Sequence, residues 1–578
     1  MSQPFGALCF ILHGHIPYVL GHSTWPHGSN MIYEAAADTY IPLLWAVEEL
    51  AYEGIPMNLT LGLTPIVMEQ LDDDRFKHWF PDYLEHRCWK ASDNIEEFQG
   101  RGDEHLAWLA GRWQQHFEAL LDSYLNRYNR DLLGQFRMHQ EAGNLEIMGS
   151  AATHGYLPLL HEDGSIQGQI MQGIATYEKF MGRPPRGFWL PECAYRPRCM
   201  WASPLPGDHE QPYPRKGLEE FLGENGVDYF VVDSHMAEGG GDPLPVRVEK
   251  ENTLGKAWSR IYRTGDYAEP KTVHRPYFVG GRFEDHPPVA CLFRDPGTSK
   301  QVWSGDIGYP GDYNYLDFHK KHMPGDHRYW RVTDAEADLG SKEVYVPEWA
   351  DERVKQHAGN FLYAVKETLR NAPHHGGKLP AVIAPFDAEL FGHWWFEGPR
   401  WLTHVVRWMH HDPDLKVMTG SNYVREEEPN AALALPEGSW GEHGGHFVWN
   451  NDRTEWVWHR IYDAEKDYQA LLRDHGPGHD CAMCELVSMA GRQLLLLQAS
   501  DWPFLINNGT AIDYASQRLV HHHDDYKRVA DMARRYGRGE YLTQEEWDWF
   551  GDLKDRERPF PDLDPCNFGQ VKNPAHDA

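Results

Sequence analysis

Cysteine and basic residues are both scarce in this 578-residue chain, and each shortage excludes a class of protein. Eight cysteines are too few for the disulfide framework of a small secreted domain, so we expect a reducing, cytoplasmic compartment. Lys and Arg number 55 against 86 Asp and Glu, which gives a formal net charge of −31. Because so acidic a surface repels nucleic acid and anionic membranes, we expect neither as a partner.

Several sequence signals are also missing. The N-terminal residues 1–5 lack the basic region and following apolar stretch of a secretory signal, and no apolar run approaches the length of a membrane span. No glycine-rich phosphate loop is found, which argues against phosphate chemistry. Cys481-Ala-Met-Cys484 is a lone C-x-x-C, with His475 and His479 as candidate further ligands, and an unpaired motif is a weak zinc signal. We therefore predict no resident metal and no cofactor.

Aromatic side chains, in contrast, are plentiful. Hydrophobic residues make up 41% of the chain and aromatic residues 13%, a globular composition. The 23 tryptophans exceed what a core alone usually needs, and tryptophan is favoured where apolar ring faces are bound.

One carboxylate follows directly on a short apolar run. Residues 188–190 predict a buried strand that stops at a proline, so Glu192 lies just beyond the C-terminal end of that strand. Trp189, Tyr195 and Arg196 surround it with flat apolar faces and a cation. In α/β barrels this end of a strand carries catalytic side chains, whereas a glutamate is more often a solvated loop residue. This stretch alone does not decide between the two interpretations.

A second apolar run ends in the same way. Residues 379–386 lead into Asp387, and the stretch that follows, Ala388-Glu-Leu-Phe-Gly-His-Trp-Trp-Phe-Glu-Gly398, is dense in aromatic side chains. Two strand-end carboxylates beside aromatic rings suit a glycosidase, because one can serve as nucleophile or base and the other as acid while the rings stack on sugars. Glu192 and Asp387 are therefore the predicted catalytic pair.

Histidines follow two further strand-like runs. Residues 7–12 end at His13-Gly-His15, and residues two apart on a strand share a face, so both imidazoles can point into one cleft. His154 follows the run at 145–149. Substrate contact, metal ligation and a structural pair all remain open for these histidines, and a third close metal ligand is not evident from the sequence.

The order of strand and helix patterns predicts a parallel α/β fold. A helix at 32–53 and a strand at 58–63 follow the first strand, and the alternation returns at 145–149. Between them, apolar residues recur every three or four positions from Leu106 to Phe136, which predicts one long amphipathic helix. We expect residues 81–139 to form an inserted helical domain, and residues 1–80 and 140–400 to form the catalytic domain.

After Asp387 the pattern is mainly helical. It predicts a C-terminal helical domain over residues 401–557 and a frayed, proline-rich tail over residues 558–578. Trp440 and Trp449 lie in glycine-rich links of this region, where we expect few helical packing partners. Both rings are therefore candidates for stacking on sugars.

Several stretches together resemble glycoside hydrolase family 57, in particular its α-1,4-glucan branching enzymes. They are His13-Gly-His-Ile-Pro-Tyr18, Glu146-Ile-Met-Gly-Ser-Ala-Ala-Thr-His-Gly-Tyr156, Phe188-Trp-Leu-Pro-Glu-Cys-Ala-Tyr195 and Asp387-Ala-Glu-Leu-Phe-Gly-His-Trp-Trp-Phe396. Asp501-Trp-Pro-Phe504 and Gly509-Thr510 are similar to the C-terminal domain of the same group. The resemblance spans nearly the whole chain, and it implies a (β/α)7 barrel with an inserted helical domain and a C-terminal helical domain.

The resemblance also implies roles for individual residues. Glu192 would be the nucleophile and Asp387 the acid/base of a retaining mechanism that transfers α-1,4-glucan chains to a 6-hydroxyl, as in glycogen-type synthesis. His13, His15 and His154 resemble the substrate-holding histidines of the family, and Asp501 matches a polar residue of its cleft. Trp303, Trp440 and Trp449 fall where the branching enzymes place tryptophans around that cleft. The implied substrate is an α-glucan.

Residues 236–290 depart from the family pattern. Branching enzymes of the family carry a loop whose tyrosine covers the site and favours transfer over hydrolysis, and here that stretch carries an insertion rich in glycine and proline. Tyr262, Tyr267 and Tyr277 are the candidate tyrosines. The departure leaves the ratio of branching to hydrolysis open.

Three other functions remain in competition. The first is an α-glucan hydrolase or 4-α-glucanotransferase on the same scaffold. The second is a metal-dependent polysaccharide deacetylase, suggested by the histidines and a related barrel. The third is a catalytically silent glucan-binding protein, which the presence of both Glu192 and Asp387 disfavours.

Overall fold

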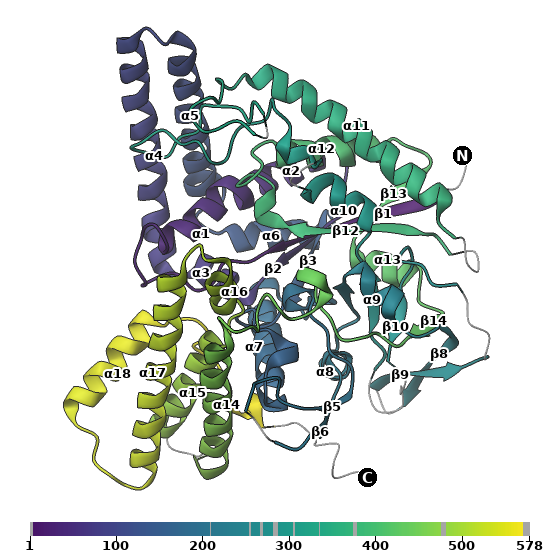
Figure 1. The fold of residues 1–578 in the computed structure, drawn as a ribbon, viewed down its shortest axis with the longest axis vertical. Coiled ribbons are helices and arrows are strands. Elements are labelled where there is room, and N and C mark those ends of the chain that lie inside the picture. Colours follow the sequence, from purple (N-terminus) through teal and green to yellow (C-terminus); the bar gives the residue numbers. More distant parts are fainter. Residues whose placement is uncertain are drawn as a thin grey trace.

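A parallel sheet lies at the centre of the molecule, which is described here by a computed structural model covering residues 4–207, 210–253, 256–265, 270–280, 287–304, 307–334, 336–373, 378–475 and 481–569 (Figure 1). Its seven parallel neighbours follow the order β12-β1-β2-β3-β4-β7-β11. They span β1 (Gly6–Gly14), β2 (Leu59–Leu63), β3 (Leu145–Ser150), β4 (Gly187–Trp189), β7 (Tyr229–Val232), β11 (Ala290–Phe293) and β12 (Ala381–Asp387). Apart from Asp387, every residue of these strands is buried, which is the pattern of a parallel sheet covered on both faces.

The crossover helices pack around this sheet. They are α1 (Ser29–Ala35), α2 (Ile41–Tyr52), α3 (Pro65–Asp72), α6 (Leu132–Glu141), α7 (Asp163–Met181), α8 (Leu218–Glu224), α9 (Ser234–Gly239), α10 (Pro296–Trp303), α11 (Pro347–Asn371), α12 (Gly398–His410) and α13 (Gly420–Glu426). A π-helical turn, Ala36–Tyr40, joins α1 to α2 without a break, so the helix expected at 32–53 exists with one widened turn. Among the described residues, no helix is long and apolar enough to cross a membrane.

Two long helices, α4 (Asp74–Arg101) and α5 (Glu104–Asp122), form a hairpin that projects away from the sheet (Figure 1). The expectation of one helix from Leu106 to Phe136 is wrong. The chain leaves α5 through a π turn at Ser123–Arg127, and Asn129 and Arg130 then adopt positive φ angles of 49° and 61°. Asp131 accepts a hydrogen bond from the Gly134 backbone N–H and thereby caps a separate helix, α6. Periodicity missed the break because both helices bury apolar residues at the same spacing.

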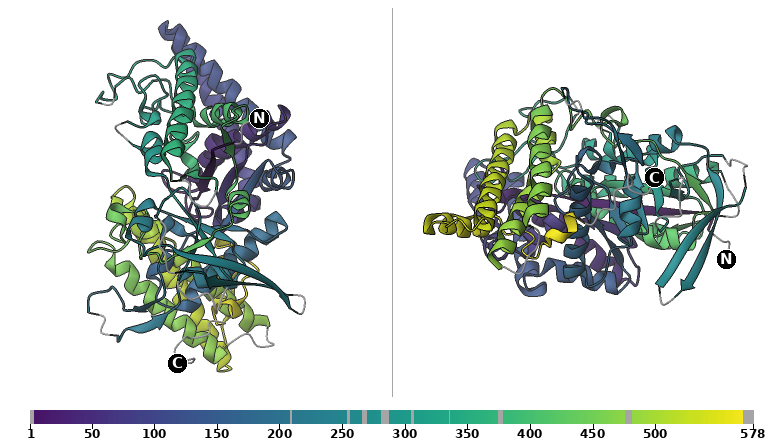
Figure 2. Two further views of the ribbon diagram at one scale, coloured as in Figure 1. Left: turned by 90° about the vertical axis from the view of Figure 1, so that its right-hand side faces the viewer. Right: turned by 90° about the horizontal axis from the view of Figure 1, so that it is seen from below.

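The expected excursion at 236–290 contains strands. β8 (Leu244–Thr253) and β9 (Lys256–Arg263) form an antiparallel hairpin that extends from one side of the molecule (Figure 2), and β10 (Tyr277–Val279) pairs with β11. The chain also returns to the sheet beyond residue 400, through β13 (Leu415–Val417) and β14 (Ala431–Leu433). A two-stranded sheet, β5 (Cys199–Trp201) and β6 (Tyr213–Arg215), lies apart.

The C-terminal region is helical from α14 onward, later than the expected start at 401, because β13 and β14 belong to the central sheet. Its helices are α14 (Glu455–His475), α15 (Cys481–Leu497), α16 (Asp501–Asn508), α17 (Ile512–Gly537) and α18 (Gln544–Arg556). The expectation of a tail that frays from residue 558 is wrong for residues 558–569, where Phe560, Leu563 and Phe568 are buried and the 3-10 turn Pro565–Phe568 packs on α7. Proline composition did not reveal these apolar anchors.

Candidate active site

Glu192 and Asp387 line one cavity of about 550 Å³. Asp387 is the last residue of β12 and pairs in register with His13 at the end of β1. Glu192 lies on the 3-10 turn Pro191–Cys193, directly after β4. Because the parallel strands end at the same edge of the sheet, two carboxylates that are distant in sequence meet in one cavity.

The backbone at Glu192 is held in an unfavourable conformation. Its φ and ψ are 62° and 24°, and Cys193 follows with φ 48°. Left-handed φ values at residues with side chains cost on the order of 1 kcal/mol each and concentrate at functional sites. The carboxylate is fixed from two sides, because Trp440 donates from Nε1 to Oε2 at 2.8 Å and the Ser500 hydroxyl donates to Oε1 at 3.3 Å.

The two carboxyl groups differ in their surroundings. Burial raises the pKa of Glu192 to about 7, and the nearby Asp501 charge adds to the effect, while the hydrogen bond from Trp440 opposes it. Burial raises the pKa of Asp387 well above its ordinary value, and the charges of Glu389 and Glu192 raise it further. At neutral pH Asp387 therefore keeps its proton in preference to Glu192, and Glu192 carries the negative charge. An acid and a nucleophile need this division.

The three predicted histidines form a connected group beside Glu192. The Nε2 atoms of His13 and His154 lie 3.0 Å apart, so one ring donates and the other accepts, and Nδ1 of His154 lies 2.8 Å from the Ser500 hydroxyl. Nδ1 of His15 hydrogen-bonds to Thr64 at 3.0 Å, and its Nε2 donates to Asp501 Oδ2 at 2.9 Å. His13 and His15 line one cavity, as two residues on the same face of a strand are expected to do, and His154 lines it with them.

Charge is unequally distributed among the three rings. Burial lowers the pKa of His13 and of His154 well below the ordinary value, and the neighbouring imidazole of His15 lowers both further. Burial also opposes charging of His15, but the Asp501 carboxylate outweighs it and raises the pKa of His15. Two neutral rings and one ring that favours its cation therefore line the cavity, and these can donate to and accept from sugar hydroxyls.

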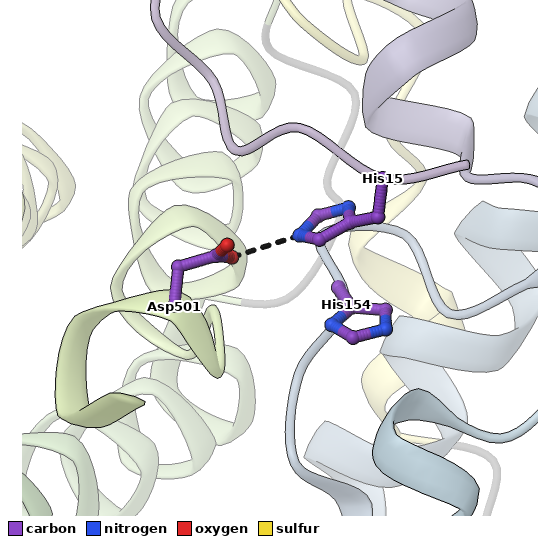
Figure 3. A group of neighbouring side chains, drawn as sticks. All are labelled: His15, His154 and Asp501. Atoms are coloured by element: carbon purple, nitrogen blue, oxygen red, sulfur yellow. Dashed lines mark hydrogen bonds and ion pairs between the residues drawn. The ribbon is translucent and has the colours of Figure 1, made fainter. Parts of the chain in front are cut away.

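His15, His154 and Asp501 are also arranged so that they could hold a metal ion, as Figure 3 shows. One donor atom from each lies within 4.8 Å of the other two, and Asp501 supplies the third ligand that the sequence did not reveal. Each of the three residues nevertheless has a protein partner, in the His15–Asp501 bond and in the bonds of His154 to His13 and Ser500. The group is thus satisfied by hydrogen bonds alone.

The predicted tryptophans all border the cavity, but in different ways. Trp303 is 36% exposed and lies 6.0 Å from Trp394, whereas Trp440 is half-buried beside Glu192. Trp449 is only 1% exposed and packs on Tyr156, with ring centroids 4.5 Å apart. Its ring neighbours come both from the loop after β3, through Tyr156, and from α16, through Phe504 with centroids 6.5 Å apart.

Sequence reasoning missed Glu389, a buried residue whose carboxylate also lines the cavity. Tyr40, at the end of the π turn, donates to Glu389 Oε1 at 2.7 Å. The same turn also contacts the loop after Glu389, because Asp38 accepts a hydrogen bond from His393 Nδ1 at 2.9 Å. Gly392, whose φ is 114°, lies so close to this turn that a Cβ on it would be 1.7 Å from the Asp38 carbonyl oxygen. Glu389 stands two residues after Asp387, within the aromatic stretch that indicated a sugar-binding site, but the sequence alone assigned it no role.

Of the candidate loop tyrosines, Tyr277 is buried in the sheet, where its hydroxyl accepts from the Thr272 backbone N–H. Tyr262 is 41% exposed on β9, and Tyr267 lies outside the described residues. Neither Tyr262 nor Tyr277 lines the cavity. Cys481 and Cys484 lie on the first turn of α15, and their candidate partner His479 lies outside the described residues.

The family model of glycosyl hydrolase family 57 matches residues 9–436, and the model of the C-terminal region of 1,4-α-glucan branching enzymes matches residues 460–568. A 1,4-α-glucan branching enzyme of Thermococcus kodakarensis is 38% identical over 558 residues, which are 96% of this chain and 77% of that protein. Its crystal structure, in complex with glucose, is similar with a TM-score of 0.85, at 36% identity, over 98% of this chain and 97% of that chain.

Two further solved structures are similar over nearly the whole chain. The branching enzyme of Pyrococcus horikoshii has a TM-score of 0.86 and 36% identity, with 98% of each chain covered. The α-amylase AmyC of Thermotoga maritima has a TM-score of 0.79 and 27% identity, over 98% of this chain and 99% of that chain. The resemblance drawn from the strand-end motifs is thereby confirmed: the chain belongs to glycosyl hydrolase family 57 and carries the C-terminal region of the family's 1,4-α-glucan branching enzymes.

Proposed function

We propose a double-displacement reaction for this chain, which is a 1,4-α-glucan branching enzyme of glycosyl hydrolase family 57. Glu192 attacks the anomeric carbon of an α-1,4-linked glucose unit, and the bond from that carbon to the leaving 4-oxygen breaks as Asp387 gives the oxygen its proton. The 6-hydroxyl oxygen of another glucan chain then attacks the anomeric carbon, returns a proton to Asp387 and releases Glu192. The product is an α-1,6 branch with retained configuration.

The observation that supports these roles best is the division of proton and charge between two carboxyl groups in one cavity. A buried carboxyl next to other anions keeps its proton, as Asp387 does, while Glu192 is oriented by two hydrogen bonds to its carboxylate. We expect the two carboxyl groups to lie about 5–5.5 Å apart, the retaining separation. His13, His15, His154 and Asp501 would hold hydroxyls of the α-glucan, and Trp303 and Trp440 would stack on its rings.

We further infer that the seven parallel strands curve into a (β/α)7 barrel. The backbone N–H of Asp295, just past β11, donates to the Ile383 carbonyl of β12 at 2.9 Å, so the two ends of the parallel order approach each other. Residues 1–80 and 140–400 would supply most of this catalytic domain and residues 81–139 its helical insertion. The region proposed as residues 401–557 would add β13 and β14 to the sheet before α14 begins.

Hydrolysis competes with branching whenever water reaches the glucosyl-enzyme first. The similarity to an α-amylase over nearly the whole chain makes this the second candidate activity. A lid within 236–290 that favours a sugar acceptor remains a proposal, since Tyr267 is not described and the other two tyrosines lie away from the cavity.

Incubation with amylose, followed by counting α-1,6 linkages and new reducing ends in one sample, tests the function. Branching predicts linkages that a debranching enzyme removes, with few new reducing ends, and Glu192→Gln and Asp387→Asn should each form none. Reducing ends without α-1,6 linkages would overturn branching in favour of hydrolysis. Activity lost on exhaustive chelation and restored by a divalent metal would instead favour a metal-dependent reaction at His15, His154 and Asp501.

A further inference from the structure

A second cavity, of about 310 Å³, lies beside the α4–α5 hairpin, between α2, α5 and the start of α12. Five rings line it: Trp45 from α2, Trp113 and His116 from α5, Tyr345 from the segment before α11, and Phe396 from the loop before α12. Trp113 and Phe396 have centroids 5.1 Å apart at 55°, and Trp45 meets His116 at 5.8 Å and 87°. Both pairs meet at steep angles, so these rings line the cavity without stacking on one another, and Trp113 stacks instead on Phe117, with centroids 5.7 Å apart.

The polar groups of this cavity balance in charge. Asp38 and Glu49 contribute two carboxylates, and Arg112 and Arg400 two guanidinium groups. Burial lowers the pKa of His116 to about 4, so its ring is neutral near pH 7. Within the part of the chain that the structure describes, the His116 ring has aromatic neighbours but no hydrogen-bond partner. Neutral hydroxyl groups suit such a lining better than an ion does.

One loop connects this cavity with the catalytic one. His393 and Trp394 line the catalytic cavity, and Phe396, two residues further on, lines the second. Asp38 lines the second cavity and accepts the hydrogen bond from His393. Both cavities therefore border the loop that follows β12, the strand that ends in Asp387.

We propose that this second cavity binds a glucose unit of the α-glucan at a distance from the bond that is cleaved. Flat aromatic walls with interspersed hydrogen-bonding groups and no net charge match the apolar faces and hydroxyls of a neutral sugar, and ligand pockets start at about 300 Å³. A second contact on the same polymer raises its apparent affinity by effective concentration without altering the chemistry. The inference rests on the proposed substrate class, not on the proposed mechanism.

The test uses native electrophoresis of the full-length chain in gels with and without amylopectin, which measures polysaccharide binding without turnover. His116→Ala removes one polar group of the pocket, and Phe396→Ala removes one aromatic wall. Trp89→Ala is the matched control, because Trp89 is 68% exposed on the neighbouring α4 and lines neither cavity. Thermal unfolding checks that each variant is folded. If Phe396→Ala is not folded, His116→Ala alone decides the test.

We expect His116→Ala and Phe396→Ala to weaken amylopectin binding about five- to tenfold, the usual effect of losing one hydrogen bond or ring contact. The Michaelis constant for amylose should rise by a similar factor, with cleavage of a maltooligosaccharide too short to reach both cavities unchanged. Retardation equal to that of the parent chain would overturn the inference, as would an equal loss in Trp89→Ala. If the parent binds amylopectin but forms no α-1,6 linkages, the proposed reaction fails while this site stands.

Discussion

Replacing Glu192 by glutamine should abolish turnover and, above neutral pH, make the folded chain more stable. The carboxylate is oriented by Trp440 and Ser500 but has lost most of its hydration, which is why burial raises its pKa to about 7. Glutamine keeps the shape of the glutamate side chain and can still accept the hydrogen bond from Trp440, but it carries no charge to desolvate. Activity and stability are therefore opposed at this residue.

The sign and size of the stability change follow from the two pKa values. In the unfolded chain Glu192 has its ordinary pKa of 4.5, and in the folded chain about 7. Between these values the folded state binds more protons than the unfolded state, so the stability contributed by this residue falls as pH rises from 4.5 to 7. One pKa unit corresponds to about 1.4 kcal/mol. Glu192→Gln should therefore raise the free energy of unfolding by about 3 kcal/mol at pH 8 and by about 1 kcal/mol at pH 5.

Urea unfolding followed by tryptophan fluorescence at pH 5 and pH 8 measures this difference. The matched control is Glu442→Gln, because Glu442 lies in an exposed turn with a side chain 60% exposed. We expect the midpoint of Glu192→Gln to exceed that of the parent clearly at pH 8 and little at pH 5, and Glu442→Gln to follow the parent at both. A gain that is equal at the two pH values, or a loss at pH 8, would refute the reasoning.

Four further variants test other parts of the site. Asp387→Asn should leave the far-UV circular dichroism unchanged and reduce branching by at least three orders of magnitude, since an amide supplies no proton, and a near-normal rate would contradict this. Glu389→Gln removes a charge that raises the pKa of Asp387, so the alkaline limb of the pH–rate profile should move to lower pH; an unmoved limb argues against this coupling. Trp440→Phe removes a hydrogen bond that favours the Glu192 carboxylate, so the acidic limb of kcat/KM should move to higher pH, and a shift downward excludes the proposed role. Trp303→Ala should raise the Michaelis constant for long glucans about five- to tenfold with little change in melting temperature, whereas a folding defect would identify a packing residue.

The strand-end carboxylates could be predicted because their signal is local. An apolar run followed by Glu192 or Asp387 is visible within ten residues, and parallel strands bring such ends to one edge of the sheet. The mixed α/β order and the C-terminal helices were visible for the same reason. The break between α5 and α6 was not, because Asn129 and Arg130 interrupt the helix through backbone angles and leave the apolar repeat unchanged.

Features that depend on long-range contacts could not be predicted. The burial of Trp449 depends on Tyr156, and the order of residues 558–569 depends on apolar anchors that pack on α7. Likewise, nothing near Glu389 in sequence indicates that Tyr40 binds it, since the contact exists only because a π turn lies against the loop after β12.

The C-terminal region completes the site electrostatically as well as sterically. Asp501, on the first turn of α16, raises the pKa of His15 together with the charges of Glu192 and Glu389, and Ser500 contacts both Glu192 and His154. The Ser500 backbone N–H also donates to the His154 carbonyl at 3.1 Å, which ties the loop after β3 to the end of α15. The orientation of the Glu192 carboxylate and the charge of His15 therefore both depend on Ser500 and Asp501, far along the chain, so the strand ends of the sheet and the C-terminal region form one cavity together.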